Sequence, residues 1–312
     1  MTGTERTLAI REMKRYHNRM QEEVSWRVVP LPPGAAYALC SAARSALWEK
    51  AIDQYCGSGP FQENDPTGRA GWRSLSLHPL RALETGDVKR LIAAPGSVLM
   101  KTLEGADAAW IGCAEPSEAE TVLTARRQFW NLRYPWELLE WSAHLLNVQR
   151  EDIQGYVYPS ACVEGVLKLG EGSVILPGTM IEGPVSIGKN CRIGPHAFLR
   201  GGVTIGDNCV VGHAVELKHC ILGDGTHMAH LSYAGDSIFG LDVNIGAGSV
   251  FSNYRHDGGE HCMILAGKLV ATGRCKLGGI IGDHARIGAN TTMLPGRVLG
   301  DGSWTLPGEV VR

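Results

Sequence analysis

The sequence predicts a mainly β protein, in which a parallel β-helix over residues 152–312 follows a smaller α/β domain. Two observations support this fold class. Of the 40 glycines, 30 lie from Gly155 onward, whereas seven of the eight tryptophans lie at or before Trp141. An aliphatic residue also recurs at every sixth position through much of the second half of this 312-residue chain. Two different architectures are therefore joined near residue 150.

The six-residue repeat is the main evidence for the β-helix. Its aliphatic positions are Val163, Leu169, Ile175, Ile181, Ile187, Ile193, Leu199, Ile205, Val211 and Leu217. Each six-residue unit fits one short strand and one turn, with the aliphatic side chain pointing inward and Gly, Asn or Asp at the turn. Three units close one coil, and stacked coils pair as parallel strands around a column of aliphatic side chains.

The repeat is interrupted once by a long insertion. The frame slips by one residue at Leu222 and again at Phe239, and it stops after Phe251 before resuming at Ile281. We expect residues 252–276 to form a loop extruded from the β-helix. Loops of this length inside a compact repeat are usually functional.

The first half of the chain carries no motif that specifies a reaction. Residues 1–118 are expected to form the α/β domain, with helices over 4–24 and 35–54, and residues 119–151 a helical linker. The only GxG run, at residues 57–59, follows a cysteine and no apolar strand. Nucleotidyl transfer needs a glycine-rich loop that cradles the phosphates, so we expect no such activity.

Composition excludes several classes of partner. The formal net charge is −2, which favours neither a nucleic acid nor an anionic membrane. Nine cysteines without a CxxC pair indicate reduced thiols and a cytoplasmic protein. We expect neither a signal peptide, because the N-terminus lacks an apolar stretch, nor a membrane span, because no run reaches 18 apolar residues.

The segment over residues 215–258, VELKHCILGDGTHMAHLSYAGDSIFGLDVNIGAGSVFSNYRHDG, holds polar residues that a β-helix does not require. With the runs IEGPVSIGKNCRIGPHAFLRGGVTIGDN and ATGRCKLGGIIGDHARIGANTTMLPG, it resembles the acetyltransferase domain of the bifunctional N-acetylglucosamine-1-phosphate uridylyltransferase/glucosamine-1-phosphate acetyltransferase family. The features are those of its sugar-1-phosphate nucleotidylyltransferase/acetyltransferase branch, without an intact nucleotidyltransferase domain. The resemblance covers residues 125–312. It implies left-handed coiling, acetyl-CoA as co-substrate and a homotrimer with acyl-CoA sites between subunits.

The resemblance also implies a role for individual residues. His230 matches the general base, and a neutral imidazole suits that task. The residues expected to bind the acceptor are Arg200, Lys218, Tyr233, Asn244 and Asn253, with Glu216 beside them. The residues expected to meet acetyl-CoA are Gly246, Ala247, Gly248, Ala289, Arg274 and Lys276. Backbone N–H groups at 246–248 are candidates to stabilise the oxyanion. Arg200 with Lys218 fit surface charges as an alternative. Arg274 with Lys276 fit ligands of the acceptor phosphate, or surface charges, as alternatives, and Asn244 fits a structural turn.

The sequence therefore predicts an acetyl-CoA-dependent N-acetyltransferase that acts on an amino-sugar phosphate by direct transfer, with no bound metal. Three alternatives stay open. The acceptor can be another amine of a specialised pathway, because the chain lacks the nucleotidyltransferase domain of its relatives. The β-helix can be a non-catalytic protein that assembles or regulates partners. A metal-dependent hydratase is the third alternative, with His213, His219, His227 and His230 as candidate ligands.

Overall fold

The computed structural model describes residues 134–265 and 268–312 without interruption. Before them it describes residues 24–28, 62–63, 73–77, 81–82, 90–91, 98–101, 107–111, 117, 119–124 and 130–132. The chain divides into two compact units, one of residues 1–31 and 51–132 and the other of residues 32–50 and 133–312. The helices predicted over 4–24 and 35–54 fall almost entirely outside the described residues. Among the described residues, no helix has the length and apolar character needed to cross a membrane.

The first unit contains a mixed sheet of six strands. Its strands are, in spatial order, β2 (Gln62–Glu63), β1 (Val24–Val28), β3 (Arg73–Leu77), β6 (Asp107–Ile111), β5 (Val98–Lys101) and β7 (Thr121–Thr124). The pairs β1–β2, β1–β3 and β5–β7 are parallel, whereas β6 runs antiparallel to both β3 and β5. A separate antiparallel pair joins β4 (Arg81–Ala82) and β8 (Trp130–Asn131).

The predicted linker helix is shorter than expected. The helix α4 covers only Glu137–Val148, and strands β7 and β8 occupy part of the segment predicted as helical. The reason is local, because Thr121, Val122 and Thr124 are β-branched and favour a strand. Pro135 disfavours a helical conformation at the residue before it, so the helix begins after it.

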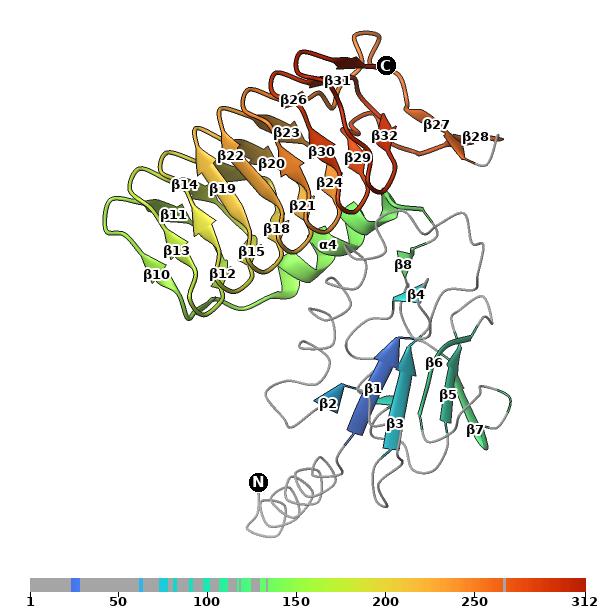
Figure 1. The fold of residues 1–312 in the computed structure, drawn as a ribbon. Helices are drawn as coiled ribbons and strands as arrows, with labels where there is room; N and C mark the ends of the chain where they lie inside the picture. The colour runs from blue at the N-terminus through green and yellow to red at the C-terminus, as the bar shows by residue number, and fades with distance from the viewer. Residues whose placement is uncertain are drawn as a thin grey trace. The chain divides into compact units, whose positions relative to one another are not determined.

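The second unit confirms the predicted fold class, a parallel β-helix with three sheets (Figure 1). The first sheet contains β10 (Tyr156–Val157), β13 (Val174–Ile175), β16 (Arg192–Ile193), β19 (Val210–His213), β22 (His227–His230), β25 (Asn244–Ile245) and β30 (Arg286–Ile287). The second contains β11 (Cys162–Glu164), β14 (Met180–Glu182), β17 (Phe198–Arg200), β20 (Glu216–Lys218), β23 (Tyr233–Gly235), β26 (Val250–Phe251), β31 (Thr292–Met293) and β33 (Val310–Val311). The third contains β9 (Asp152–Ile153), β12 (Leu167–Leu169), β15 (Val185–Ile187), β18 (Val203–Ile205), β21 (Ile221–Leu222), β24 (Ile238–Phe239), β29 (Ile280–Ile281) and β32 (Val298–Leu299).

The frame slips in the sequence are changes in coil length. Paired residues of successive coils are first 18 residues apart, as for Arg192 and Val210, and then 17 apart, as for Val210 and His227. Between Asn244 and Arg286 the separation is 42 residues, which is 25 more than one short coil. The additional residues form the insertion between β26 and β29. It contains the antiparallel hairpin of β27 (Cys262–Leu265) and β28 (Lys268–Ala271).

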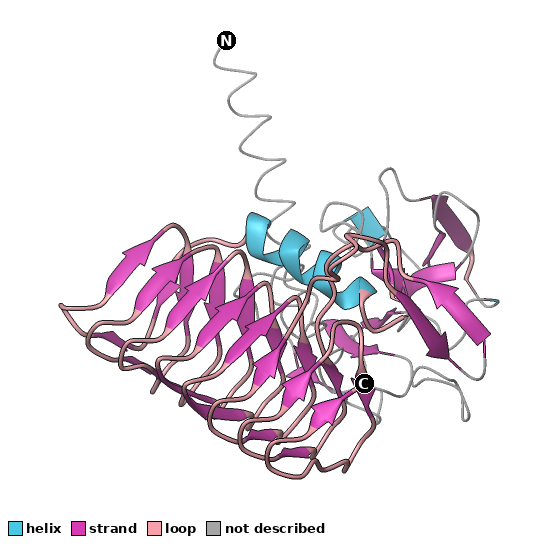
Figure 2. Ribbon diagram, turned by 90° about the horizontal axis from the view of Figure 1, so that it is seen from above, coloured by secondary structure: helices cyan, strands magenta, loops and turns pink. Residues whose placement is uncertain are grey.

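The interior of the β-helix is a column of buried aliphatic and aromatic side chains, and the repeat positions from Leu169 to Leu217 all belong to it. The third sheet is also buried on its outer face, where Thr204, Ile221 and Ile238 are at most 3% exposed. Helix α4 lies along this side of the stack of coils (Figures 1 and 2). A buried hydrogen bond of 2.8 Å between the hydroxyls of Ser142 and Thr204 joins helix and sheet.

Candidate functional site

A shortened corner between the second and third sheets brings two ionisable side chains together. In the 18-residue coil this corner holds Gly201 and Gly202, whereas each of the next two coils has a single residue there, His219 and then Asp236. Both adopt a left-handed backbone conformation, with φ of 53° and 46°. Because they hold the same position in adjacent coils, their side chains are neighbours, and His219 Nδ1 lies 2.8 Å from Asp236 Oδ1.

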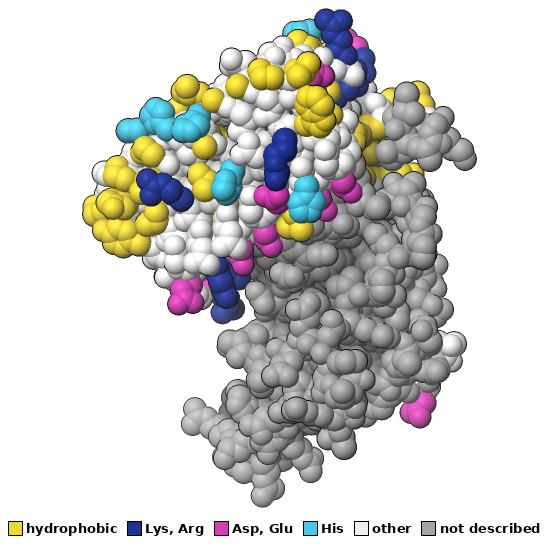
Figure 3. Space-filling model, in the orientation of Figure 1, with side chains coloured by type: hydrophobic (Ala, Val, Ile, Leu, Met, Phe, Trp, Pro, Cys, Tyr) yellow, Lys and Arg dark blue, Asp and Glu magenta, His cyan; other side chains and the backbone are white. Residues whose placement is uncertain are grey.

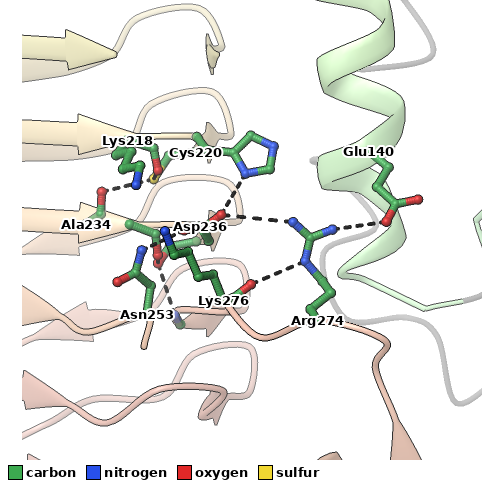
Figure 4. Close-up of polar contacts among 12 residues, drawn as sticks. Glu140, Lys218, Cys220, Ala234, Asp236, Asn253, Arg274 and Lys276 are labelled. Atoms are coloured by element: carbon green, nitrogen blue, oxygen red, sulfur yellow. Dashed lines mark hydrogen bonds and ion pairs between the residues drawn. The ribbon is translucent and has the colours of Figure 1, made fainter. Parts of the chain in front are cut away.

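Asp236 is the centre of a hydrogen-bonded cluster at this corner (Figure 4). Asn253, at the start of the insertion, donates from Nδ2 to Asp236 Oδ2 at 2.6 Å. The guanidinium of Arg274, at the end of the insertion, lies 4.0 Å from Asp236 Oδ1 and 3.2 Å from Glu140 Oε1 on α4. The Asp236 side chain is only 8% exposed. Burial alone would raise the pKa of Asp236, but the hydrogen bonds from His219 and Asn253 and the charge of Arg274 outweigh it, so the pKa is lowered.

A cavity of about 380 Å³ lies beside this cluster. Its polar lining comes from Lys218, His219, Asp236 and Lys276, together with Asn147 of α4. Its apolar and backbone lining comes from Ala143, Leu146, Pro184, Gly201 and Gly202. Two lysines therefore line one space, and their positive charge favours an anionic group there.

The outer face of the second sheet carries most of the residues predicted to bind the acceptor. Arg200 and Lys218 are paired neighbours on β17 and β20, and Glu216 pairs with Tyr233. Arg200 donates from Nε and Nη2 to Glu216 Oε1, at 2.8 and 2.5 Å. Burial and the charge of Glu216 raise the pKa of Tyr233.

Gly235 leaves room for two site side chains to meet. A Cβ atom at this position would lie 2.5 Å from both the Tyr233 hydroxyl and Asn253 Nδ2. Any larger residue would therefore displace one or both groups. The absence of a side chain at Gly235 thus allows the phenol and the amide to lie next to each other.

The corner between the first and second sheets holds His230 and the residues predicted to bind the thioester. His230 is exposed at the end of β22, beside His213 of β19. Gly248 N donates to His230 O at 3.2 Å, and Asn290 N donates to Ala247 O at 2.8 Å, so Ala247 and Ala289 lie in adjacent coils at this corner. Gly246 N–H is also engaged, by Ile287 O. Of the three candidate oxyanion donors, Ala247 N–H alone has no partner among the described residues.

Three predicted site residues lie away from the other residues predicted to bind the same substrate. Asn244 is exposed on β25 in the first sheet, whereas Tyr233 and Asn253 lie on the second sheet and after it. Arg274 and Lys276, predicted to meet acetyl-CoA, lie with Asp236 and Lys218 at the second–third corner. Because the second sheet separates that corner from Gly246 and Ala289, Arg274 and Lys276 lie near Lys218 and not near the residues predicted to bind the thioester.

The four histidines considered as metal ligands do not form one cluster. His213, His227 and His230 are exposed on the first sheet, and His219 pairs with Asp236 at the second–third corner. Within the described parts of the chain, no group of three or more His, Cys, Asp or Glu side chains is arranged to hold a metal ion. Figure 3 shows histidine and charged side chains on the visible face of the β-helix, among a surface that is largely backbone and small polar groups.

Asp236 and Glu140 were not predicted from the sequence, and His219 was considered only as a candidate metal ligand. Asp236 was part of the HLSYAGD run, but an Asp after Gly is typical of a turn. The contact between Glu140 and Arg274 joins residues 134 positions apart, which no local pattern reveals. The one available signal in the sequence was the frame slip. Each slip marks a coil that is one residue shorter at this corner, and the single corner residues of two adjacent short coils, His219 and Asp236, lie side by side.

Comparison with known proteins supports the resemblance on the same part of the chain. The model of the GMPPB C-terminal domain matches residues 181–254, and the model of the hexapeptide repeat of succinyl-transferase matches residues 280–304. A bifunctional sugar-1-phosphate nucleotidylyltransferase/acetyltransferase from Sulfurisphaera tokodaii is 44% identical over 100 residues, covering 32% of this chain and 25% of that protein. The bifunctional protein GlmU from Methanococcus maripaludis strain C7 is 47% identical over 176 residues, covering 56% of this chain and 43% of that protein.

The similarity to solved structures is lower. A hexapeptide transferase family protein from Anaplasma phagocytophilum has a TM-score of 0.30 at 15% identity, over 50% of this chain and 71% of its own. PerB from Caulobacter crescentus, solved in complex with CoA and GDP-perosamine, has a TM-score of 0.23 at 16% identity, over 91% of this chain and 93% of its own.

From residue 152 onward the chain is a hexapeptide-repeat β-helix, by both its repeat and its fold. Its sequence similarity is to GlmU-like bifunctional nucleotidyltransferase/acetyltransferases, and the matched family models lie in its C-terminal part. The predicted resemblance is thereby confirmed. The chain spans less than half the length of these curated relatives.

Proposed function

We propose that this chain is an acetyl-CoA-dependent N-acetyltransferase whose acceptor is an amino-sugar phosphate such as glucosamine 1-phosphate. One observation carries the proposal: His230, Tyr233 and Asp236 follow one another along one coil, and Lys218 of the adjacent coil pairs with Gly235, between Tyr233 and Asp236. A base, an amide and phenol pair and two ammonium groups match the amine, the hydroxyls and the phosphate of such a sugar. The name of a relative, a bifunctional sugar-1-phosphate nucleotidylyltransferase/acetyltransferase, agrees with this chemistry.

In the proposed mechanism the acceptor amine attacks the thioester carbonyl directly. His230 accepts the proton that the nitrogen loses as the N–C bond forms. Ala247 N–H donates to the oxyanion of the tetrahedral intermediate. The C–S bond then breaks, the CoA thiolate takes the proton from His230, and the products are the N-acetyl sugar and CoA thiol.

The acceptor phosphate is assigned to the cavity at the second–third corner. Lys218 and Lys276 both line it, and each offers charge-assisted hydrogen bonds to a phosphate. Arg200 is a third cation assigned to the phosphate, but Glu216 already accepts from two of its nitrogens. We therefore assign the larger share of phosphate binding to Lys218.

An acceptor screen with acetyl-CoA and detection of released thiol tests this function. The panel contains glucosamine 1-phosphate, glucosamine 6-phosphate, glucosamine and a nucleotide-linked amino sugar. We expect enzyme-dependent thiol release with glucosamine 1-phosphate and much less with unphosphorylated glucosamine. Turnover of the nucleotide-linked sugar alone would favour the alternative of a different acceptor. No turnover with any amine would favour a non-catalytic β-helix.

A further inference from the structure

The buried carboxylate of Asp236 determines which atoms of two neighbouring side chains remain available to a ligand. Asp236 Oδ1 lies 2.8 Å from His219 Nδ1, and Oδ2 lies 2.6 Å from Asn253 Nδ2. An ionised carboxylate can only accept hydrogen bonds, so both partners must donate to it. The orientation of the amide and the tautomer of the imidazole are therefore set by Asp236.

The consequence is an outward-facing hydrogen-bond acceptor on Asn253 and a fixed imidazole on the other side of Asp236. Asn253 uses its NH₂ group on Asp236, which directs its carbonyl oxygen away from the carboxylate. His219 uses Nδ1–H on Asp236, so its Nε2 faces away from the carboxylate. One carboxylate thus fixes the orientation of both groups.

Several contacts keep this arrangement fixed. The Asp236 side chain is 8% exposed, and its backbone N–H donates to Lys218 O at 2.9 Å. Arg274 stands between Asp236 and Glu140 of α4, and its own side chain is 14% exposed. A buried carboxylate with three cationic or donor partners stays ionised and in place.

Asn253 and His219 border the proposed acceptor site on either side of Asp236. The Asn253 amide and the Tyr233 hydroxyl both lie close to Gly235, on the outer face of the second sheet. His219 lines the cavity that Lys218 also lines. A sugar phosphate bound across this corner would therefore meet donors from the lysines and a hydrogen-bond acceptor from Asn253.

We propose that Asp236 is a positioning residue that makes the acceptor site select a sugar carrying hydrogen-bond donors, above all an amine beside a phosphate-bearing carbon. The inference rests on the proposed function, since it explains how the same site selects its substrate. It goes further by attributing selection of the amine to a carboxylate that acts through the orientation of Asn253 and His219.

The test compares two ligands that differ in one donor. Glucosamine 1-phosphate has an amine at carbon 2, and 2-deoxyglucose 1-phosphate has no donor there. Calorimetric titration of the wild-type protein should give at least about tenfold tighter binding of the amine, because hydrogen bonds to charged groups contribute that much. In Asp236→Asn the new amide can donate a hydrogen bond as well as accept one, so the Asn253 amide is free to flip. The preference for the amino sugar over 2-deoxyglucose 1-phosphate should then fall to about threefold or less.

A swapped pair provides the matched control. The double variant Asp236→Asn/Asn253→Asp again pairs one donor with one carboxylate, and it leaves a carboxylate oxygen facing outward. Its preference for the amine should return to at least about tenfold, the value expected for the wild type. Binding of acetyl-CoA should be the same in all three proteins.

The outcomes separate this inference from the proposed function. Equal weakening of both sugars in Asp236→Asn, or a double variant that recovers its thermal stability without the preference, would show a merely structural role and overturn the inference. A wild-type protein that binds neither sugar would also overturn it. A protein that shows the predicted preferences but releases no thiol from acetyl-CoA would support the inference while refuting the acetyltransferase function.

Discussion

At the scale of single residues, the chemistry at the corner between the second and third sheets depends on two positions. There a single larger residue stands where the preceding 18-residue coil has a pair of glycines. His219 and Asp236 hold left-handed backbone conformations that cost an ordinary residue about 1 kcal/mol or more. Asn and Asp tolerate this conformation best, because their side chains bond locally. The cost is offset by the hydrogen bonds that the two side chains make with each other and with Asn253.

The two predicted phosphate ligands, Lys218 and Arg200, differ in how far they are already engaged. Lys218→Ala should raise the KM for the phosphorylated acceptor by about 10- to 100-fold, because a hydrogen bond to a charged group contributes roughly 1.5–3 kcal/mol. Arg200→Ala should have a smaller effect, since Glu216 already holds its guanidinium. Steady-state kinetics with saturating acetyl-CoA measures both values. An equal KM for phosphorylated and unphosphorylated acceptors in the wild type would refute the phosphate assignment.

At the scale of elements, α4 belongs to the β-helix. Its buried side chains include Leu138, Leu139, Trp141, Leu145 and Leu146, and its Gln149 neighbour donates to Val185 O at 3.0 Å. The same helix carries Glu140, which holds Arg274 of the insertion. Helix, insertion and coils thus meet at the cluster around Asp236.

Truncation tests the contribution of α4. A chain of residues 134–312 should keep the thermal midpoint of the β-helix transition seen in the full chain. A chain of residues 152–312 lacks α4, and its free energy of unfolding should be lower by several kcal/mol. The reason is that each large apolar side chain of α4 contributes roughly 1.5–3 kcal/mol on burial. Circular dichroism with thermal melting measures both. Equal midpoints for the two truncated chains would contradict this account of α4.

The insertion contains a buried histidine that couples its stability to pH. His261 is 3% exposed, and burial, together with the charges of Arg255 and Arg297, lowers its pKa. A lowered histidine pKa means that the unfolded state binds the proton more readily, so this contribution to stability is present above about pH 6.5 and is lost as the pH falls through the folded-state pKa. His261→Gln should therefore flatten the loss of thermal stability between about pH 7 and pH 5.

The control for this prediction is His256→Gln, since His256 is exposed in the same insertion. It should leave the pH dependence of the wild type unchanged. A His261→Gln protein whose melting temperature falls with acid as steeply as the wild type would contradict the assignment.

The elements show what sequence could and could not predict. The coils were predictable because a period of six with inward aliphatics leaves few other solutions, and the frame slips at Leu222 and Phe239 correspond to real shortening of the coils. The segment before α4 was misread as helix, because strand pairing of Thr121–Thr124 with Val98–Lys101 depends on a distant partner. The cluster around Asp236 was not predictable, because its members meet only after the coils stack.

At the scale of the whole molecule, the candidate site spans more than one side of the β-helix. Asn244 lies on the first sheet, and Tyr233 lies on the second. Asn244 can contribute to the same site only if the first sheet of one subunit faces the second sheet of another. We therefore predict a homotrimer with three-fold symmetry and sites between subunits.

Light scattering and subunit mixing test the trimer. The mass should be three times 33.6 kDa. Mixed trimers of two inactive variants, Asn244→Ala and His230→Ala, should recover part of the wild-type activity, because some sites then receive both intact residues. A monomer at assay concentration would contradict the proposal of acyl-CoA sites between subunits.

The central claim is that His230 is the base of an acetyl transfer from acetyl-CoA to an amino-sugar phosphate. The most direct measurement is kcat for thiol release with saturating glucosamine 1-phosphate, in the wild type, in His230→Ala and in His213→Ala. The last variant is the control, because His213 is the neighbour of His230 in the adjacent coil. The account predicts a loss of about 10²–10⁴-fold in His230→Ala, with acetyl-CoA affinity unchanged, and near wild-type turnover in His213→Ala. A loss of less than about tenfold in His230→Ala, or an equal loss in both variants, would contradict it.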